Sequence, residues 1–523
     1  MKNKAICLGL FFLSIVLFAL SQPSLFFEDG LSFCAWFAYI PFFLLLDRIS
    51  LVSSPLWGAA YGAFSYFLLC WWLSAFGLVA ISFVCFLFAV YNAILFTLVS
   101  FAKRLFPKSL SKFFWVWRAG LVLSVEFIRT HGIFAFSYGI IGYSQWKSPL
   151  FLHSASFLGV FGISFLILLV NSLVALVISE RNLRTHLSKC AFLCAILLSL
   201  VLAWKIHAFF LRTAGQDSIS VVLVQDASSA SSRSISQYNE DFLLLKRLTD
   251  EALLLNPDTE LVVWPETAIV PDILYHLDKG GDSARHALAL AVYSYIRSKS
   301  CAFLIGNNHR DEKGEHNSAL YFSPDYPEIG IYDKNHLVPF TEFWPDFLDF
   351  PVFDGIKGSL DCEFFSHGSG IRTFSIRTSL GRDLRFSVPI CFEDSFSSLM
   401  RRMKLDGADF FVNISDDAWA REKSAQNMHL SMSAFRCAEF ATPMIRSTID
   451  GKTCVIGVDG LVVSAMESGI DGFLYERCMI PAKTASFYSI VGEWYLWIFS
   501  VLVFLSVLIL SVRFVKVRVY GRR

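Results

Sequence analysis

The chain has 523 residues, enough for more than one hydrophobic core; 55% of them are hydrophobic and only 17% are charged. Soluble globular domains are about 45–50% apolar and about 25% charged, so this composition excludes an ordinary soluble protein and favours an integral membrane protein. The formal net charge of +1 gives no support to nucleic-acid binding.

Eight apolar segments are long enough to cross a hydrocarbon core of ~30 Å. They are 5–21, 25–46, 55–75, 78–101, 113–130, 155–179, 190–210 and 490–512. The sequence between the last two segments has mixed polarity. We therefore predict a membrane bundle of about seven helices at 1–215, a separate domain at 216–485, and a closing helix with a basic tail at 486–523.

Alternate connections between these segments are basic, and Lys and Arg concentrate in the cytoplasmic loops of membrane proteins. The basic residues are Lys2, Lys4, Arg48, Lys103, Arg104, Lys108, Lys112, Arg181, Arg184 and Lys189, and in the tail Arg513, Lys516, Arg518, Arg522 and Arg523. We therefore expect a multi-pass membrane protein with both termini in the cytoplasm. Seven crossings then place the middle domain on the opposite side of the membrane, which in a bacterium is the periplasmic side.

The middle domain alternates strand and helix patterns. Short β-branched runs predict buried strands, and apolar residues spaced by three and four predict amphipathic helices. Strands are expected at 218–225, 260–264, 301–307, 318–323, 328–334, 373–379, 384–391, 408–415, 444–451, 453–460 and 462–468, and helices at 239–255, 284–299, 395–408 and 424–441. This order predicts a layered α/β sandwich attached to a polytopic α-helical membrane bundle.

Three reactive residues stand at or near the ends of predicted strands: Glu266 in ELVVWPETA, Lys334 in IGIYDKNHLVPFTEF and Cys391 in RFSVPICFEDS. Catalytic groups of such folds collect at strand ends, so the three converge if their strands are neighbours. A carboxylate can accept a thiol proton, an ammonium can stabilise an oxyanion, and a sulfur can carry an acyl group. Each residue alone also has an ordinary explanation, as a capping Glu, a surface Lys or a buried Cys.

No metal or cofactor is expected. Twelve cysteines are present, but neither a CxxC pair nor an HExxH motif occurs, and no Gly-rich phosphate loop is found. An exported domain permits disulfides, although Cys391 must stay free if it is a nucleophile. The cysteines of the middle domain are Cys301, Cys362, Cys391, Cys437, Cys454 and Cys478.

The motifs WPET at 264–267, DKNHLVPFTE at 333–342 and VPICFE at 388–393 resemble, in this order, the carbon–nitrogen hydrolase (nitrilase) superfamily with its Glu–Lys–Cys triad. With the helices before and after, the chain is similar to bacterial apolipoprotein N-acyltransferases over essentially its whole length. The stretches SVEFIRTHG and GIIGYSQ in the membrane half belong to this resemblance. The resemblance implies a nitrilase-like αββα sandwich outside the membrane.

By the same resemblance, Glu266 is the general base, Lys334 the oxyanion-stabilising cation and Cys391 the nucleophile. Supporting or substrate-binding roles are implied for Asn317, Phe340, Glu342, Phe392, Glu393 and Trp419. Three positions depart from the family pattern. Phe392 stands where a Tyr is common, Asp416 replaces an Asn, and the loop after the first strand lacks a Trp, with Tyr238 its nearest aromatic residue.

The activity implied is transfer of a fatty acyl chain from a membrane phospholipid, through a thioester on Cys391, to an apolipoprotein. The acceptor is the α-amine of the diacylglyceryl-modified N-terminal cysteine. The chain is expected to act as a monomer in the membrane.

Two other functions stay open. A membrane-tethered amidase would use the same triad but need no phospholipid. A transporter or sensor would only bind a ligand, would tolerate loss of Cys391, and would have membrane helices broken by Pro or Gly. Two local questions are also open. The aromatic segment 339–353 either shields a thioester or packs ordinarily, and Arg118, Glu126 and Arg129 either meet a lipid headgroup or stabilise the bundle.

Overall fold

The structure is a computed structural model that describes residues 2–213, 216–227, 234–280, 283–346, 349–358, 364–420, 422–481 and 485–520. The chain divides into two compact units. The helical unit contains Met1–Phe210, Glu422–Ser431 and Ile490–Arg523. The sheet unit contains Leu211–Arg421 and Met432–Ser489.

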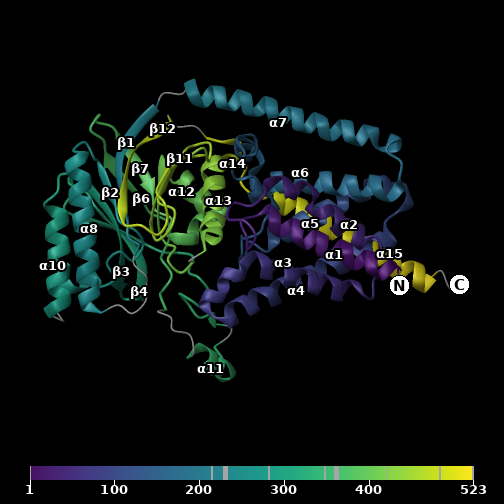
Figure 1. Ribbon diagram of the computed structural model, residues 1–523, viewed down its shortest axis with the longest axis horizontal. Coiled ribbons are helices and arrows are strands. Elements are labelled where there is room, and N and C mark those ends of the chain that lie inside the picture. Colours follow the sequence, from purple (N-terminus) through teal and green to yellow (C-terminus); the bar gives the residue numbers. More distant parts are fainter. Residues whose placement is uncertain are drawn as a thin grey trace. The chain divides into compact units, whose positions relative to one another are not determined.

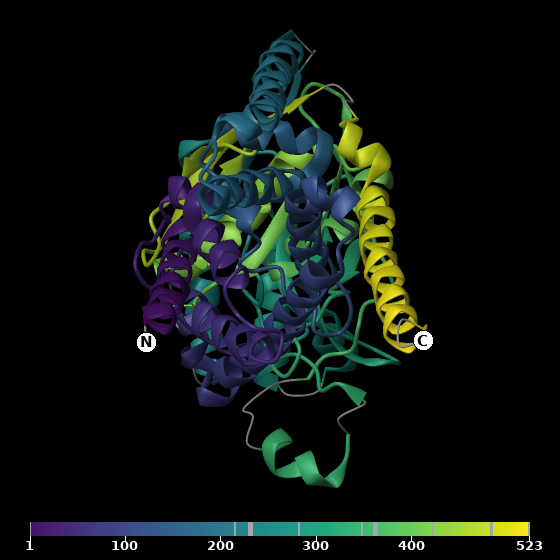
Figure 2. The ribbon, with the colours of Figure 1, turned by 90° about the vertical axis from the view of Figure 1, so that its right-hand side faces the viewer.

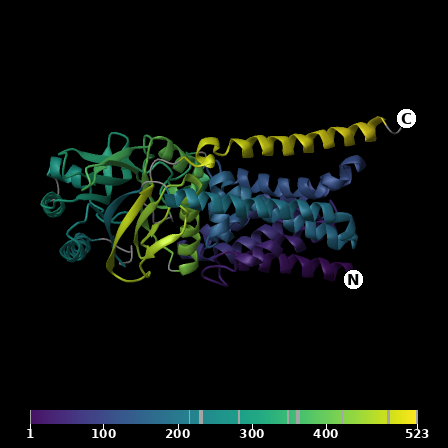
Figure 3. The same cartoon turned by 90° about the horizontal axis from the view of Figure 1, so that it is seen from above.

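Long helices that run in roughly the same direction build the helical unit (Figure 3). They are α1 (Lys2–Ser21), α2 (Ala35–Leu46), α3 (Ser54–Cys70), α4 (Leu78–Leu105), α5 (Phe114–Ile128), α6 (Pro149–Glu180), α7 (Leu187–Thr213) and α15 (Trp494–Tyr520). Helix α7, in teal, stands apart from α1 to α6 (Figures 1 and 2), and only 6% of its apolar span is buried. Such a helix exposes apolar side chains all round, as lipid-facing helices do.

The eight membrane spans that the sequence predicted are confirmed only in part. Within the described residues, six helices are long and apolar enough to cross a bilayer: Asn3–Ser21, Ser54–Phe76, Leu78–Leu105, Pro149–Glu180, Arg184–Lys205 and Trp494–Val512. The predicted spans 25–46 and 113–130 are not confirmed. Helices α2 and α5 have 12 and 15 residues, so they rise only about 18 Å and about 22 Å against a core of ~30 Å.

Arg118 of α5 is paired inside the helical unit. Its guanidinium lies 3.2 Å from Asp47 and donates to the hydroxyl and the carbonyl of Ser172, both at 2.7 Å. The centroid of the Phe43 ring lies 4.5 Å from the guanidinium carbon, which stacks over the ring. Through these contacts Arg118 links α5 to α6 and to the end of α2. For this residue the structure therefore supports a role in stabilising the bundle.

Two six-stranded sheets form the sheet unit. The first has the order β12 (Gly472–Pro481), β1 (Gln216–Gln225), β2 (Leu261–Val263), β3 (Ala302–Asp311), β4 (Gly314–Phe322) and β5 (Ile329–Asp333). The second has the order β11 (Val462–Ala465), β10 (Cys454–Ile456), β9 (Met444–Ile449), β8 (Phe410–Asp416), β7 (Asp383–Ser387) and β6 (Thr373–Arg377). The triplets β1–β2–β3 and β7–β8–β9 are parallel and the remaining pairs antiparallel.

Helices cover the outer faces of both sheets (Figure 1). On the first sheet, α8 (Ile235–Leu255) and α10 (Ser283–Arg297) bury Leu245 and Val292 against strand residues such as Phe303. On the second lie α12 (Ser397–Leu405) and residues 432–440 of α13 (Lys423–Phe440). The Ser447 hydroxyl donates across the sandwich to the Val224 carbonyl at 2.7 Å. The predicted sandwich is therefore present as helix, sheet, sheet, helix; short helices α9 (Ile273–Lys279), α11 (Asp354–Lys357) and α14 (Phe487–Val491) complete the unit.

Strand β12 was not predicted from the sequence. It pairs antiparallel with β1 over its full length, from Gln216 opposite Pro481 to Gln225 opposite Gly472. Its side chains are mostly half-buried and include adjacent Glu476 and Arg477, so the simple alternation of an amphipathic strand is lost. Pairing with a strand distant in sequence stabilises this segment instead.

Two prolines end strands earlier than predicted. Strand β2 stops at Val263, before Pro265, and β7 stops at Ser387, before Pro389. Proline has no N–H to donate to a strand neighbour, so the ladder ends there. Glu266 and Cys391 consequently lie on turns beyond the strands.

Gly306 of β3 makes room for the turn that carries Glu266. A Cβ atom at this position would meet the Pro265 carbonyl and come within 2.6 Å of Glu266 Cα. We expect Gly306→Ala to lower the free energy of unfolding by about 1–3 kcal/mol, because the backbone of the turn must shift. In the exposed helix α11, Gly355→Ala meets nothing within 4 Å and is the control. Denaturant unfolding followed by tryptophan fluorescence tests this, and equal stability of both variants contradicts it.

Candidate active site

Glu266 and Lys334 meet in the interior of the sheet unit. Glu266 follows β2 and Lys334 follows β5, and Lys334 Nζ lies 3.0 Å from Glu266 Oε1. Lys334 is fully buried and Glu266 is 4% exposed. Cys391 follows β7 of the other sheet, and its thiol is close enough to both charges for each to shift its pKa. The ends of strands from two sheets thus place a carboxylate, an ammonium and a thiol together.

Lys334 is held by a second carboxylate. Its Nζ lies 2.7 Å from Glu342 Oε1, and Asn317 Nδ2 donates to both carboxylates, at 2.7 Å to Glu266 and 3.2 Å to Glu342. The Val338 N–H donates to the other Glu342 oxygen at 2.7 Å. An ammonium has three N–H donors, so two are used here and one is available to a substrate oxygen.

The second oxygen of Glu266 accepts a hydrogen bond from the backbone N–H of Asp416 at 2.7 Å. Asp416 is the residue that replaces the family's Asn. Because the contact comes from the backbone, it does not depend on the side chain at this position. The departure noted in the sequence therefore leaves the support of Glu266 intact.

Cys391 lies at the start of a tight turn with a strained backbone. Its φ is +53°, in the left-handed region that β-carbon-bearing residues rarely occupy. Asn413 Nδ2 donates to the carbonyls of Pro389 and Cys391, both at 3.0 Å, and so holds the turn on both sides of the strained residue. Strain of this kind persists only where surrounding contacts enforce it, and it is common at active sites.

The charges determine the protonation of the site. Burial alone disfavours the Lys334 ammonium, but Glu266 and Glu342 outweigh it and raise the pKa of Lys334 well above its usual value. Burial, followed by the charge of Glu266, raises the pKa of the Cys391 thiol well above its usual value, against the lowering effect of Lys334. The resting site consequently contains a thiol and a permanently charged ammonium at neutral pH.

Glu393 joins the turn of Cys391 to the loop of Lys334. Its carboxylate is fully buried. Burial raises the pKa of Glu393 to about 7, although the donors around it act in the opposite direction. The donors are the backbone N–H groups of Ile390, Asn335 and His336, at 2.9, 2.7 and 3.0 Å, and the Tyr332 hydroxyl at 3.0 Å. The structure thus places Glu393 in a bracing position, where it links the two loops.

The predicted aromatic residues are all partly exposed. The Phe392 ring centroid lies 5.8 Å from Lys334 Nζ, so the ring borders the site without a hydroxyl. Phe340 has φ of +67° and stacks edge-on with Trp344 at 5.6 Å. Trp419 lies in the segment after β8. Tyr238 packs against the core of the first sheet, and residues 228–233 of the preceding loop lie outside the described residues.

A buried ion network under the Cys391 turn was missed in the sequence. Arg446 of β9 lies 3.1 Å from Asp394 and 2.9 Å from Asp417, and it donates to Asn413 Oδ1 at 2.7 Å. All four residues are at most 1% exposed. Asn413 donates to the carbonyls of Pro389 and Cys391, so Arg446 holds the Cys391 turn in place through Asn413. The sequence did contain a signal for this network, because an arginine inside the otherwise apolar strand MIRSTI indicates a buried charge that needs a partner.

Among the described residues, no group of three or more His, Cys, Asp or Glu side chains could hold a metal ion. The cysteines there, Cys391 included, are free thiols. Cys362 lies outside the described residues.

The opposing effects of Glu266 and Lys334 on the thiol can be measured. We expect Cys391 in Glu266→Gln to react several-fold faster with a small neutral alkylating reagent at pH 8 than in the wild type, because removal of the negative charge lowers the thiol pKa. Lys334→Met should react more slowly, and the wild-type rate should rise without a plateau from pH 7 to 9. Mass spectrometry gives the rates, and the reverse order of the two variants contradicts the assignment.

Arg446→Met leaves two buried carboxylates without a counter-charge. We expect the free energy of unfolding of the sheet unit to fall by about 3–5 kcal/mol. The control is Arg382→Met, which removes a pair with Asp217 in which the arginine is 66% exposed; that change should be within about 1 kcal/mol. Denaturant unfolding compares the two, and similar losses would show that the buried network does not stabilise the fold.

Both parts of the chain match known families. Residues 14–173 match the apolipoprotein N-acyltransferase N-terminal domain, and residues 227–478 match the carbon–nitrogen hydrolase family. A solved carbon–nitrogen hydrolase from Helicobacter pylori G27 is 19% identical, and the match covers 50% of this chain and 89% of that chain with a TM-score of 0.37.

Two curated relatives are similar along nearly their entire length. Apolipoprotein N-acyltransferase 1 of Treponema denticola is 30% identical over 554 aligned residues, which cover 100% of this chain and 99% of the relative. The protein of the same name from Treponema pallidum is 33% identical over 514 residues, covering 92% of each chain. The family predicted from the three motifs is confirmed, and the chain belongs to the apolipoprotein N-acyltransferase family.

Proposed function

We propose that this protein transfers a fatty acyl chain from a membrane phospholipid to the α-amine of a diacylglyceryl-modified apolipoprotein, through a thioester on Cys391. The observation that carries the proposal is the buried Lys334 ammonium, held by Glu266 and Glu342 beside a thiol on a strained turn. The family named by the relatives supports the choice of substrates. No cofactor takes part in the mechanism.

In the first step, Glu266 accepts the proton of Cys391 as the sulfur attacks the ester carbonyl of the phospholipid. The available N–H of Lys334 and the backbone N–H of Phe392 stabilise the oxyanion, and one such donor contributes about 3–4 kcal/mol. The C–O bond then breaks, and the proton passes from Glu266 to the departing oxygen of the lysophospholipid. A thioester on Cys391 remains.

In the second step, the neutral α-amine of the acceptor attacks the thioester. Ordinary α-amino groups have a pKa of about 7.7–8.0, so a useful fraction is neutral at physiological pH. A C–N bond forms, the C–S bond breaks, and Glu266 passes the amine proton to the sulfur. The products are an amide-linked acyl chain and the original thiol.

Deep burial suits this sequence of steps. Glu266 and Cys391 are 4% and 6% exposed, so bulk water has little access to the thioester. A high pKa keeps the resting thiol protonated and unreactive until a substrate carbonyl is in place. Proton transfer to Glu266 and attack by sulfur are then coupled, as in general base catalysis.

The remaining assignments belong to the same proposal. The protein acts as a monomer in a bacterial inner membrane, with the membrane bundle at 1–215, the catalytic domain at 216–485 in the periplasm, and the helix and tail at 486–523. Both termini are cytoplasmic. With the eight apolar segments predicted from the sequence, the alternating basic connections support this orientation. Asn317, Glu342 and Glu393 position the triad, and Phe340, Phe392 and Trp419 contact acyl chains.

The acyl-enzyme can be observed directly. Purified protein is incubated with labelled phospholipid, and intact mass spectrometry should show the addition of one acyl chain that peptide mapping assigns to Cys391. In Cys391→Ala this addition should be absent, because no other thiol lies next to Glu266 and Lys334 in the described chain. The matched control is Cys194→Ala, at an exposed cysteine of α7, which should acylate like the wild type.

Addition of a diacylated lipopeptide then tests the acceptor. The label should leave Cys391 and appear in amide linkage at the lipopeptide N-terminus. If the label is released as free fatty acid while the lipopeptide stays unmodified, the protein is a hydrolase and the proposed transfer is wrong. If Cys391→Ala still acquires the acyl chain, Cys391 is not the nucleophile.

A further inference from the structure

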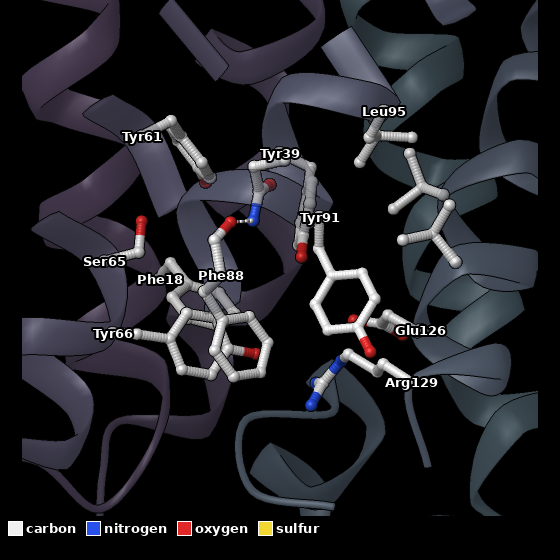
Figure 4. Close-up of a pocket in the computed structure, with 13 residues that line it drawn as sticks. Phe18, Tyr39, Tyr61, Ser65, Tyr66, Phe88, Tyr91, Leu95, Glu126 and Arg129 are labelled. Atoms are coloured by element: carbon white, nitrogen blue, oxygen red, sulfur yellow. Dashed lines mark hydrogen bonds between the residues drawn. The ribbon is translucent and has the colours of Figure 1, made fainter. Parts of the chain in front are cut away.

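A small cavity lies inside the helical unit, between α1, α2, α3, α4 and α5 (Figure 4). Its volume is about 40 Å³, and most of its wall is aromatic or aliphatic. Two charged side chains of α5, Glu126 and Arg129, also line it, and in Figure 4 the Tyr91 ring is directed toward them. Glu126 is 6% exposed and Arg129 is 3% exposed.

In each of these two side chains, one terminal polar atom is hydrogen-bonded and another has no partner within hydrogen-bond distance among the described residues. Glu126 Oε1 accepts from the Ile141 N–H at 3.3 Å, and the hydroxyls of Tyr39 and Ser164 face the same carboxylate. Oε2 has no partner within hydrogen-bond distance among the described residues. Arg129 Nη1 donates to the carbonyls of Phe136 and Tyr138, at 2.6 and 2.9 Å, while Nη2 has no partner in the same part of the chain. Ser65 Oγ, also on the wall, is buried near the Tyr61 hydroxyl and has no partner within hydrogen-bond distance in the described part of the chain.

These unpaired atoms call for a molecule that both donates and accepts hydrogen bonds. Glu126 Oε2 needs a donor and Arg129 Nη2 needs an acceptor, and no salt bridge joins the two side chains directly within the described residues. A carboxylate and a guanidinium together are neutral, so a bound ion would leave a net charge among apolar helices. The ligand that fits is small, dipolar and neutral.

We propose that this cavity is a binding site for water molecules that bridge Glu126 and Arg129. One bound water needs roughly 10–15 Å³ of such space, so the cavity holds about three. A phospholipid headgroup is too large for it. The water completes the hydrogen bonding of both charges without a change in the aromatic wall, where the guanidinium carbon of Arg129 lies 5.0 Å from the Phe88 ring centroid.

The bridge also supports the chain that follows α5. The connection between α5 and α6 contains Phe136, Tyr138 and Ile141. The carbonyls of Phe136 and Tyr138 accept hydrogen bonds from Arg129, and the Ile141 N–H donates to Glu126. Irregular backbone at membrane depth needs protein or water partners, because lipid offers none. The hydrated pair is therefore a clamp that holds the 136–141 segment in place.

Radiolytic hydroxyl-radical footprinting of the full-length protein in detergent tests for this water, because radicals formed from bound water oxidise the side chains around it. Tyr39 and Tyr66 line the cavity and are 7% and 5% exposed. Fully buried Tyr488 of the sheet unit, which does not line the cavity, is the reference. We expect oxidation of Tyr39 and Tyr66 to be at least fivefold faster than that of Tyr488. Equal rates at the three tyrosines overturn the proposal.

Two variants make the test specific. Glu126→Gln keeps an acceptor and should retain the fast oxidation of Tyr66. The double variant Glu126→Leu with Arg129→Met removes both polar groups, and its oxidation should fall to the level of Tyr488. If that variant does not fold, the wild-type comparison still decides. If delipidation of the wild type raises the oxidation of Tyr39 and Tyr66 several-fold, a lipid group had occupied the cavity and the assignment to water is wrong.

Discussion

The structure of the site depends on one buried cation, the ammonium of Lys334. Taking a charge out of water is costly unless opposite charges are fixed around it. Here two carboxylates on two loops pair with the ammonium, and the Asn317 amide donates to both of them. The same contacts fix the orientation of Glu266, the general base of the proposed reaction. The ammonium therefore stabilises the fold of the site and, in the proposed reaction, the oxyanion.

Cys391, the proposed nucleophile, has its own support in the second sheet. A strained residue such as Cys391 keeps its conformation only if its neighbours cannot relax. Asn413 binds the carbonyls on either side, Arg446 anchors Asn413, and Glu393 ties the turn to the loop of Lys334. The first sheet thus carries Glu266 and Lys334, and the second carries Cys391. Buried hydrogen bonds of Glu393 hold the Cys391 turn next to the Lys334 loop.

Both units contain buried charged side chains, but these side chains find their partners in different ways. In the sheet unit, Lys334 and Arg446 are each paired directly with two carboxylates, and the proposed chemistry takes place beside Lys334. In the helical unit, Arg118 is paired directly with Asp47, whereas Glu126 and Arg129 each leave one half toward a small cavity. A polar group at membrane depth that the protein itself does not satisfy requires a ligand, and here water is the ligand that fits.

The sequence by itself determined the class of protein, the sandwich and the three strand-end residues that the structure brings together, because these follow from local composition, periodicity and short motifs. It did not determine the number of full membrane spans, since hydropathy does not reveal that α2 and α5 are short helices. Strand β12 and the role of Arg446 also depend on partners far away in the chain. Only the tertiary structure decides such pairings, because a strand edge or a buried charge is stabilised by whatever the fold places beside it.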